Sequence, residues 1–236
     1  MANYLIIAAS SGIGRSLVEG LQAGGHSIFQ TSREAGKIEH DALLDATDFD
    51  AVDYVFAAAK EKLGSLDGVV NCAGSLLLKP AHLTTSDQFR AVMDASVTTS
   101  FAVVRADGKH MTTGGSVVLI SSAAALEGIA NHEAIATAKA GIIGLALSSA
   151  ATYAGQNLRF NVVAPGLVET SMTKPIIASD AARKLSEGMH ALGRLGKPDD
   201  IARAIIFLLD PKNSWITGQT LAVDGGLSCV RPRLRA

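Results

Sequence analysis

A turn at residues 7–14 reads Ile7-Ala8-Ala9-Ser10-Ser11-Gly12-Ile13-Gly14 and lies between an apolar run and a helical pattern. A turn of this kind lets backbone N–H groups approach a phosphate, and the N-terminus of the following helix favours negative charge. Gly12 and Gly14 suit the close approach and the packing of that helix. Similar glycines also occur in tight turns that bind nothing, so the turn alone leaves both interpretations open.

Short apolar runs alternate with helical patterns outward from this turn. We expect strands at residues 4–7, 26–31, 66–71, 116–121, 158–164 and 220–224, and helices at 12–23, 48–63, 86–109, 131–154, 178–190 and 198–209. Apolar runs without alternation indicate strands buried on both faces, and the strand–helix order implies a parallel sheet with right-handed crossovers. The sequence therefore predicts an α/β fold, a single-domain, Rossmann-type doubly wound parallel sheet over residues 1–236.

The composition argues against several classes of function. Lys and Arg total 21 against 22 Asp and Glu, which is unlike a nucleic-acid binder or an electrostatic membrane binder. We expect no transmembrane helix, because no uninterrupted apolar run approaches about 18 residues. The first residues do not resemble a signal peptide, and Cys72 and Cys229 lie far apart, so we expect a reducing cytoplasm. Neither cysteine has metal-ligand spacing and the histidines are scattered, so we expect no metal site.

Further segments give the turn a specific context. They are Asn71-Cys72-Ala73-Gly74, Ser122, Lys139, Pro165-Gly166 with Thr170, and the glycine-containing stretches at residues 193–198, 216–218 and 224–226. Together with the turn they resemble the short-chain dehydrogenase/reductase family of single-domain size, over essentially the whole chain. The resemblance implies a nicotinamide-dependent oxidoreductase that forms homodimers or homotetramers. Ala8 departs from the pattern because it replaces the first glycine, and a positive φ there would carry a conformational cost.

The resemblance also implies a set of cofactor-binding residues. They are Ala9, Ser10, Ser11, Gly12, Ile13, Gly14, Ser32, Arg33, Asp45, Ala46, Asn71, Ala73, Gly74, Lys139, Pro165, Gly166, Val168 and Thr170. NAD sites of this type usually have an acidic residue at the end of the second strand, but this strand ends in Ser32 and Arg33. Serine and arginine suit a 2′-phosphate, so we predict NADP(H). A solvated Arg33 that binds nothing is the alternative.

The catalytic residues depart from the family pattern of a serine, a Tyr-x-x-x-Lys pair and an asparagine. Ser122 and Lys139 match, whereas Ile135 stands at the tyrosine position and Ser96 at the asparagine position. None of the chain's tyrosines has a lysine four residues later; they are Tyr4, Tyr54 and Tyr153. An aliphatic side chain cannot donate a proton, so the usual proton donor is absent. We expect Lys139 to be exposed and charged and to hold the nicotinamide ribose. Protonation of the substrate by a Lys139 of depressed pKa is the alternative.

His132 is the candidate replacement for the tyrosine. It lies seven residues before Lys139, which places both on nearly the same helical face. Related enoyl reductases have a tyrosine at this spacing. A histidine is a competent proton donor near neutral pH. A surface histidine in the first helical turn behind an N-cap Asn131 is the alternative.

Residues 167–192 correspond to the family's substrate lid. Their apolar side chains, among them Met172, Ile176 and Met189, suit a hydrophobic small-molecule substrate or, equally, ordinary packing of an amphipathic helix. The predicted function is an NADP(H)-dependent oxidoreductase that transfers hydride to or from a small carbonyl, alcohol or activated double bond, with a non-standard proton donor. Two alternatives stay open: a catalytically silent NADP(H)-binding sensor or partner subunit, and an isomerase or lyase on the same fold.

Overall fold

The computed structural model describes residues 1–231, which contain one sheet of seven parallel strands. The strands are β1 Asn3–Ile7, β2 Ser27–Ser32, β3 Ala42–Leu43, β4 Gly68–Asn71, β5 Gly115–Ile120, β6 Leu158–Pro165 and β7 Thr220–Val223. They lie in the order β3-β2-β1-β4-β5-β6-β7. This arrangement confirms the predicted Rossmann-type doubly wound sheet.

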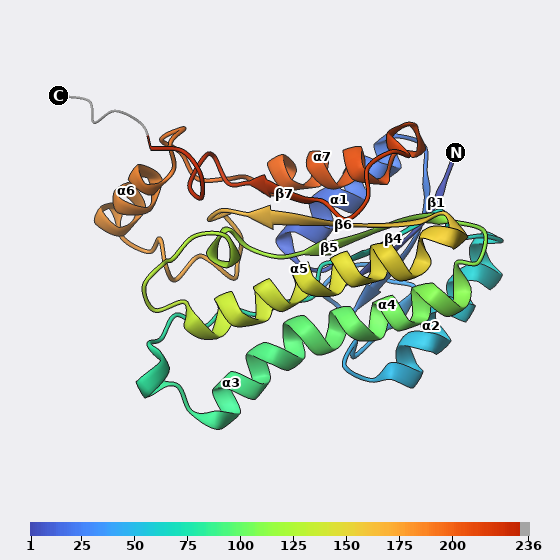
Figure 1. Cartoon of the computed structure of the whole chain (residues 1–236), viewed down its shortest axis with the longest axis horizontal. Helices are drawn as coiled ribbons and strands as arrows, with labels where there is room; N and C mark the ends of the chain where they lie inside the picture. The colour runs from blue at the N-terminus through green and yellow to red at the C-terminus, as the bar shows by residue number, and fades with distance from the viewer. Residues whose placement is uncertain (232–236) are drawn as a thin grey trace.

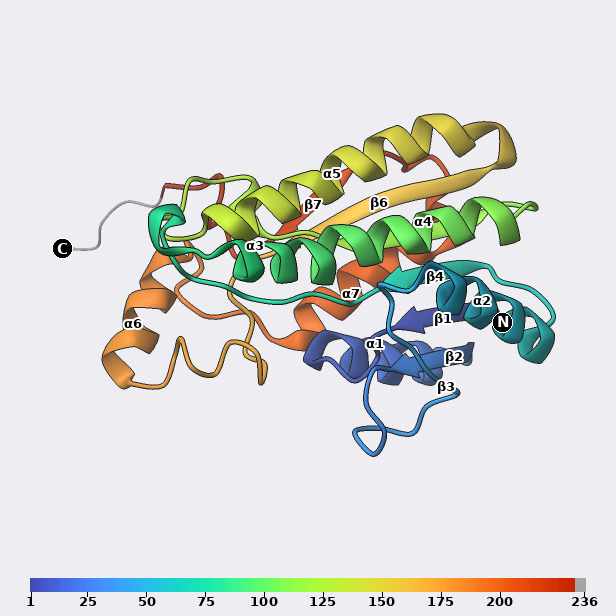
Figure 2. The ribbon, with the colours of Figure 1, turned by 90° about the horizontal axis from the view of Figure 1, so that it is seen from below.

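Helices cover both faces of the sheet (Figures 1 and 2). One face carries α1 Gly12–Ala23 and α7 Pro198–Leu209, and the other carries α2 Phe49–Leu63, α4 Thr99–His110 and α5 Glu133–Tyr153. The helix α3 Ser86–Met93 runs into α4 through a π-helical turn, and α6 Asp180–Met189 lies beyond one end of the sheet (Figure 1). The helical part of the lid, α6, therefore lies outside the two packed layers, whereas Val168 at the start of the lid belongs to the core beside α1 and α7.

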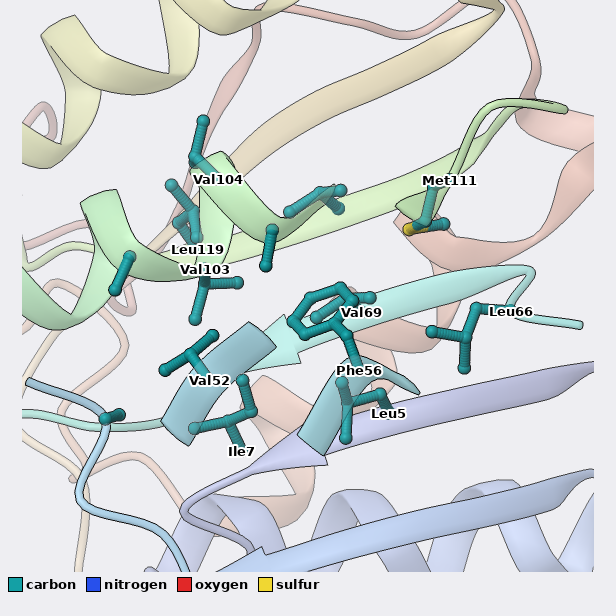
Figure 3. Close-up of a cluster of buried hydrophobic side chains, with 14 of the residues drawn as sticks. Leu5, Ile7, Val52, Phe56, Leu66, Val69, Val103, Val104, Met111 and Leu119 are labelled. Carbon is teal, nitrogen blue, oxygen red and sulfur yellow. The ribbon is translucent and has the colours of Figure 1, made fainter. Parts of the chain in front are cut away.

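Alternate side chains of each strand enter two separate hydrophobic cores, as the pleat requires. Leu5 of β1 and Val69 of β4 face the α2 side, where the ring of Phe56 packs beside them (Figure 3). Tyr4 and Ile6 of β1 face the opposite core with α1 and α7. Burial on both faces explains why these strands appear in the sequence as apolar runs.

The chain order reverses between β1 and β4, which are neighbours in the sheet. The register pairs Ile7 with Asn71, so the carboxyl ends of both strands lie side by side. In open α/β sheets ligands bind at such a switch point, outside the carboxyl ends of the strands. The fold therefore places the turn at residues 7–14 where a ligand site is expected.

Several predicted element bounds needed correction. The helix predicted over residues 86–109 contains a π-helical turn at Asp94–Thr98, and the strand β3 is too short to show a sequence pattern. The prediction of Asn131 as an N-cap was wrong. Asn131 adopts a left-handed conformation with φ of 63°, and α5 begins two residues later, after His132. The helices at residues 12–23 and 198–209 have the predicted bounds.

One segment, Glu133–Gln156, is long and apolar enough to cross a membrane by length and composition alone. This is weak evidence for a membrane span, because the core helix of a sheet protein passes the same test. The buried residues of α5, such as Ile142 and Ala146, pack into the core beside the sheet. The helix is apolar because one side of it is a core element.

Asp107 on α4 is fully buried, and neither of its carboxylate oxygens has a hydrogen-bond partner within residues 1–231. Burial raises the pKa of this carboxyl well above its ordinary value of 3.8. The native protein therefore retains a proton that the unfolded chain releases above about pH 4, and stability falls as the pH rises towards neutrality. We expect Asp107→Val to raise the free energy of unfolding at pH 7 by about 1–3 kcal/mol, measured by urea titration.

The gain should shrink as the pH falls through the ordinary pKa of 3.8, because below it the wild-type carboxyl is protonated in both the folded and the unfolded state. Asp107→Asn is the matched control, since it keeps the shape and polarity but does not titrate. A valine variant that is less stable than the wild type at pH 7 would contradict this description of Asp107.

Candidate active site

Steric contacts explain both glycines of the turn. A Cβ on Gly14 would lie 2.8 Å from the carbonyl oxygens of Ala8 and Ala9, so α1 approaches β1 too closely for any side chain. A Cβ on Gly12 would lie 2.7 Å from Cγ2 of Thr170, which belongs to the loop that covers the turn. Ser11 caps α1, and its Oγ accepts a hydrogen bond of 3.0 Å from the Gly14 N–H. The first turn of α1 thus leaves backbone donors beside the cavity described next.

Ala8, which replaces the first glycine, has a φ of 56°. The backbone at this position therefore lies in the left-handed region, where a residue with a Cβ is disfavoured. The Ala8 N–H still donates to Thr31 Oγ1 at 3.3 Å, which ties the turn to β2. The turn therefore keeps its geometry at a local conformational cost.

A cavity of about 190 Å³ lies under this turn, at the carboxyl ends of β1, β4, β5 and β6. Ten of the predicted cofactor residues line it: Ser11, Gly12, Ile13, Ala73, Gly74, Lys139, Pro165, Gly166, Val168 and Thr170. Cys72, Ser122 and Ile135 line it too. The lining does not include the other predicted residues, which are Ala9, Ser10, Gly14, Ser32, Arg33, Asp45, Ala46 and Asn71.

Asn71 supports the cavity from behind. Its side chain is buried, and Nδ2 donates to Thr99 Oγ1 and Ser100 Oγ on α4, both at 3.3 Å. Its Oδ1 accepts a hydrogen bond of 3.0 Å from the Ala73 N–H. Asn71 therefore fixes the wall at residues 72–74 without reaching the cavity.

At the end of β2 the positive charge of Arg33 lies beside the negative charge of Glu34. The Arg33 side chain is 76% exposed, and its Nη2 lies 3.7 Å from Glu34 Oε1. Ser32 is buried and its Oγ donates to the Glu34 carbonyl at 2.8 Å. The pKa of Asp45 is lowered by hydrogen bonds from the backbone and side chain of Thr47 and, to a smaller extent, by the charge of Arg33. Arg33 thus lies near enough to Asp45 for its charge to act on that carboxyl, and in the described part of the chain the ion pair of Arg33 with Glu34 is long and exposed.

Lys139 is buried, with 6% of its surface exposed, which corrects the expectation of an exposed lysine. Its Nζ donates to the Ile120 carbonyl at 2.8 Å, and Ser121 Oγ donates to the Lys139 carbonyl at 2.8 Å. Burial lowers the pKa of Lys139 to about 8, against a smaller opposing effect of the Cys72 thiol. Burial also raises the pKa of Cys72 to about 12, so that thiol stays protonated.

Ser96 lies inside the π-helical turn and is fully buried. Its Oγ has no hydrogen-bond partner among the residues that the structure describes, whereas its carbonyl accepts from Ser100 Oγ at 2.7 Å. Ser96 lines neither this cavity nor the adjoining one, so the structure does not bring it together with Lys139 and Ser122. The Ser96 hydroxyl, at the family's asparagine position, therefore lies behind the site and does not reach either cavity.

A second cavity of about 180 Å³ adjoins the first, and Ser122 and Ile135 are among the six residues that line both, with Leu76, Pro165, Gly166 and Thr173. Most of the side chains that line only the second cavity are apolar and include Leu78, Ile129, Ile176, Met189 and Leu227. Ser122 caps a 3-10 turn, and its Oγ accepts from the Ala124 N–H at 3.2 Å, which leaves its own O–H free to donate. Ile135 is buried and forms the wall between the cavities at the position where the family has its tyrosine.

His132 lines this apolar cavity but not the first one, so His132 and Lys139 serve adjoining cavities. His132 Nδ1 lies 2.8 Å from the Ala130 carbonyl oxygen. Because a carbonyl only accepts, Nδ1 carries the proton in the neutral ring, and Nε2 keeps its lone pair. The arrangement provides one hydrogen-bond donor, Ser122, and one acceptor, His132, in an apolar pocket.

His190 is a residue whose part in the site the sequence analysis missed. It is buried in the lid, lines the apolar cavity, and its Nε2 accepts from the Leu167 N–H at 3.1 Å. Its Nδ1 donates to the Ser186 carbonyl at 2.7 Å. His190 therefore fastens α6 to the loop that follows β6, beside Gly166, where a Cβ would lie 2.8 Å from Nε2. Its position within an apolar lid segment was a signal, but its partner Leu167 lies 23 residues away in sequence.

No three His, Cys, Asp or Glu side chains within residues 1–231 are arranged to hold a metal ion. Ser122 lines both cavities, Lys139 lines the first and His132 lines the apolar one.

Comparisons with known proteins agree with this architecture. The family described as Enoyl-(Acyl carrier protein) reductase matches residues 7–228. The chain is 37% identical over 209 residues to the "Inactive 2-(S)-hydroxypropyl-CoM dehydrogenase 2" of Xanthobacter autotrophicus, covering 85% of this chain and 90% of that one. It is 31% identical to the 3-oxoacyl-[acyl-carrier-protein] reductase FabG of Vibrio harveyi, covering 96% and 97% of the two chains.

Solved structures with the same fold superpose closely on this chain. A short-chain type dehydrogenase/reductase from Mycobacterium ulcerans superposes with a TM-score of 0.92 at 28% identity, covering 98% of this chain and 91% of that one. ElxO with NADP bound superposes with a TM-score of 0.89 at 27% identity, covering 96% and 98%. The sequence match, the sheet order and the cavity at the switch point agree, and the chain belongs to the short-chain dehydrogenase/reductase family, a family of oxidoreductases.

Proposed function

We propose that the protein is an NADP(H)-dependent oxidoreductase that transfers hydride to or from a small, uncharged carbonyl, alcohol or activated double bond. The observation that carries the proposal is the pair of adjoining cavities, one under the glycine turn and one apolar, which share Ser122 and Ile135. A nicotinamide cofactor supplies or accepts the hydride when bound. The apolar cavity of about 180 Å³ suits a small substrate without charge.

The residues of the first cavity fit such a cofactor. The turn leaves no room for a Cβ at Gly12 or Gly14, which keeps the backbone donors of α1 open to a pyrophosphate. Lys139 would hold the nicotinamide ribose, and Thr170 would contact the nicotinamide amide. Arg33, exposed at the end of β2 with no carboxylate in the NAD position, favours a 2′-phosphate. The NADP-bound structure of ElxO supports the same choice.

We assign the proton transfer to His132 with Ser122, because Ile135 cannot hydrogen-bond. The Ser122 O–H donates to the substrate oxygen. The lone pair on Nε2 makes neutral His132 a proton acceptor, which is the role required when an alcohol is oxidised. In the reverse direction the protonated ring donates from Nε2.

The direct test is single-turnover hydride transfer, followed by cofactor absorbance, with a panel of small secondary alcohols, ketones, quinones and enoyl thioesters. We expect transfer with an uncharged small member of the panel. Tight NADPH binding without transfer to any member would overturn the oxidoreductase assignment and favour the silent alternative.

A catalytically silent NADP(H)-binding sensor or partner subunit is the second candidate. Ile135 in place of the catalytic tyrosine favours it, and so does a relative that is 37% identical and is named inactive. Such a protein would bind the cofactor through the same cavity and would use its lid only to signal occupancy. Both candidates predict that NADP(H) binds, but only the oxidoreductase predicts hydride transfer to a substrate.

The variant Ile135→Tyr tests what the isoleucine removes. We expect it to raise the rate of small-ketone reduction by about tenfold or more, because it restores a phenol to the wall between the cavities. Ile135→Phe is the matched control, since it adds the ring without the hydroxyl and carries the same packing cost. Equal rates for the two variants would show that a proton donor at this position is not what limits the reaction.

We also propose a homodimer or homotetramer in the cytoplasm. Phe101 on α4 and Leu147 on α5 are each about half exposed, at 51% and 54%, which suits helix packing between subunits. Trp215 is 99% exposed near the edge strand β7. Cys72 and Cys229 are free thiols, which supports a reducing compartment.

A further inference from the structure

Lys139 combines burial with a lack of counter-charge. Only 6% of the residue is exposed, and the Ile120 carbonyl is the partner that Nζ has in the described structure. No carboxylate within residues 1–231 forms an ion pair with it. A buried ammonium without a carboxylate is costly, and such a group tends to lose its proton.

The amine is nevertheless reachable through the first cavity. Lys139 lines that cavity of about 190 Å³, which shares its Ser122 and Ile135 wall with the apolar cavity. The absence of a side chain at Gly74 keeps space open beside the amine, since a Cβ there would lie 3.3 Å from Nζ. Ile135, one helical turn before Lys139, offers an aliphatic wall in place of a hydroxyl. A small apolar carbonyl compound thus has a route to Nζ.

We propose that Lys139 is a carbonyl-capturing lysine, which condenses with small uncharged aldehydes when no cofactor occupies the cavity. The Nζ lone pair forms a bond to the carbonyl carbon. The carbonyl oxygen then leaves as water with the two amine protons, and an imine remains. The step needs no oxidant, reductant or metal. Lysines desolvated in apolar pockets are the ones that form Schiff bases.

The ionisation of the group supports this reactivity. Burial lowers the pKa of Lys139 to about 8, whereas an exposed lysine titrates near 10.5. Roughly a tenth of the Lys139 amine is therefore neutral and nucleophilic at pH 7. Capture should rise with pH through about 8, because the neutral amine is the reacting form.

The test is reductive trapping on the full chain. The protein is incubated with propanal and cyanoborohydride, which fixes the imine as a propyl-lysine, and peptide mass spectrometry locates the label. We expect Lys139 to be labelled at least about tenfold faster at pH 7 than the exposed Lys212. Labelling spread evenly over exposed lysines, or absent from Lys139, would overturn the proposal.

Two further arms separate this proposal from the proposed function. Lys139→Arg should remove the fast label, whereas Lys212→Arg should keep it; the wild-type peptide map decides the case if the first variant does not fold. NADPH should slow the labelling of Lys139 by occupying the same cavity. Fast labelling that NADPH leaves unchanged would support capture and would count against the proposed cofactor placement.

Discussion

Gly14→Ala should abolish NADPH binding and lower the free energy of unfolding by on the order of 3 kcal/mol. The added Cβ would lie 2.8 Å from the Ala8 and Ala9 carbonyl oxygens and the Ala9 Cα, and backbone atoms cannot move aside as the tip of a side chain can. Relief requires α1 to move away from β1, which displaces the donors that face the cavity. Urea titration measures the stability, and isothermal titration calorimetry measures the binding.

Gly144→Ala is the matched control, because it makes the same change within a helix where nothing lies within 4 Å of the new Cβ. Alanine there should raise stability by about 1 kcal/mol through its better helix propensity and leave NADPH binding unchanged. A Gly14→Ala protein that binds NADPH with wild-type affinity would show that the contact between α1 and β1 is not needed for the site.

His132→Ala should lower the single-turnover rate of alcohol oxidation by about 10²–10⁴-fold, the usual effect of removing a general base. Its affinity for NADPH should stay within about twofold of the wild type, because His132 does not line the first cavity. Added imidazole should restore part of the rate, since it can enter the space left by the ring beside Ser122. A rapid-mixing measurement of cofactor absorbance gives all of these rates.

The control for His132 is His82→Ala, which removes an exposed histidine outside both cavities. It should leave the rate unchanged. An undiminished rate in the His132→Ala variant would remove His132 from the mechanism, whereas a loss that imidazole does not rescue would indicate a structural effect of the histidine at the start of α5.

The fold followed from local patterns. Strands that are buried on both faces appear in the sequence as apolar runs. Gly12 and Gly14 appear in the turn because a Cβ at either position would collide with Thr170 or with Ala8 and Ala9. The family resemblance then identified most of the first cavity, whose lining comes from segments that each carry a short motif. Local sequence was enough because these contacts lie at the end of β1 and in the loop that follows β6.

The features that the sequence could not predict depend on contacts between segments that are distant in sequence. Lys139 is buried because the end of β5 at Ile120, the segment at Gly74 and the loop near Thr170 enclose it. The spacing of residues along a helix cannot predict burial by segments that are distant in sequence. The tautomer of His132 depends on the Ala130 carbonyl in a turn that the left-handed Asn131 creates. Asp107 was missed because its burial is set by tertiary packing of α4.

A calorimetric titration of the wild-type chain with NADPH and with NADH measures directly whether the first cavity holds NADP(H). We expect binding at one site per chain, with NADPH tighter by about tenfold or more. A charge-assisted contact from Arg33 to the 2′-phosphate is worth roughly 1.5–3 kcal/mol. Arg33→Ala should erase the difference, and Arg90→Ala, which removes another exposed arginine, should keep it. Equal affinity for the two cofactors in the wild type, or no binding of either, would contradict the account.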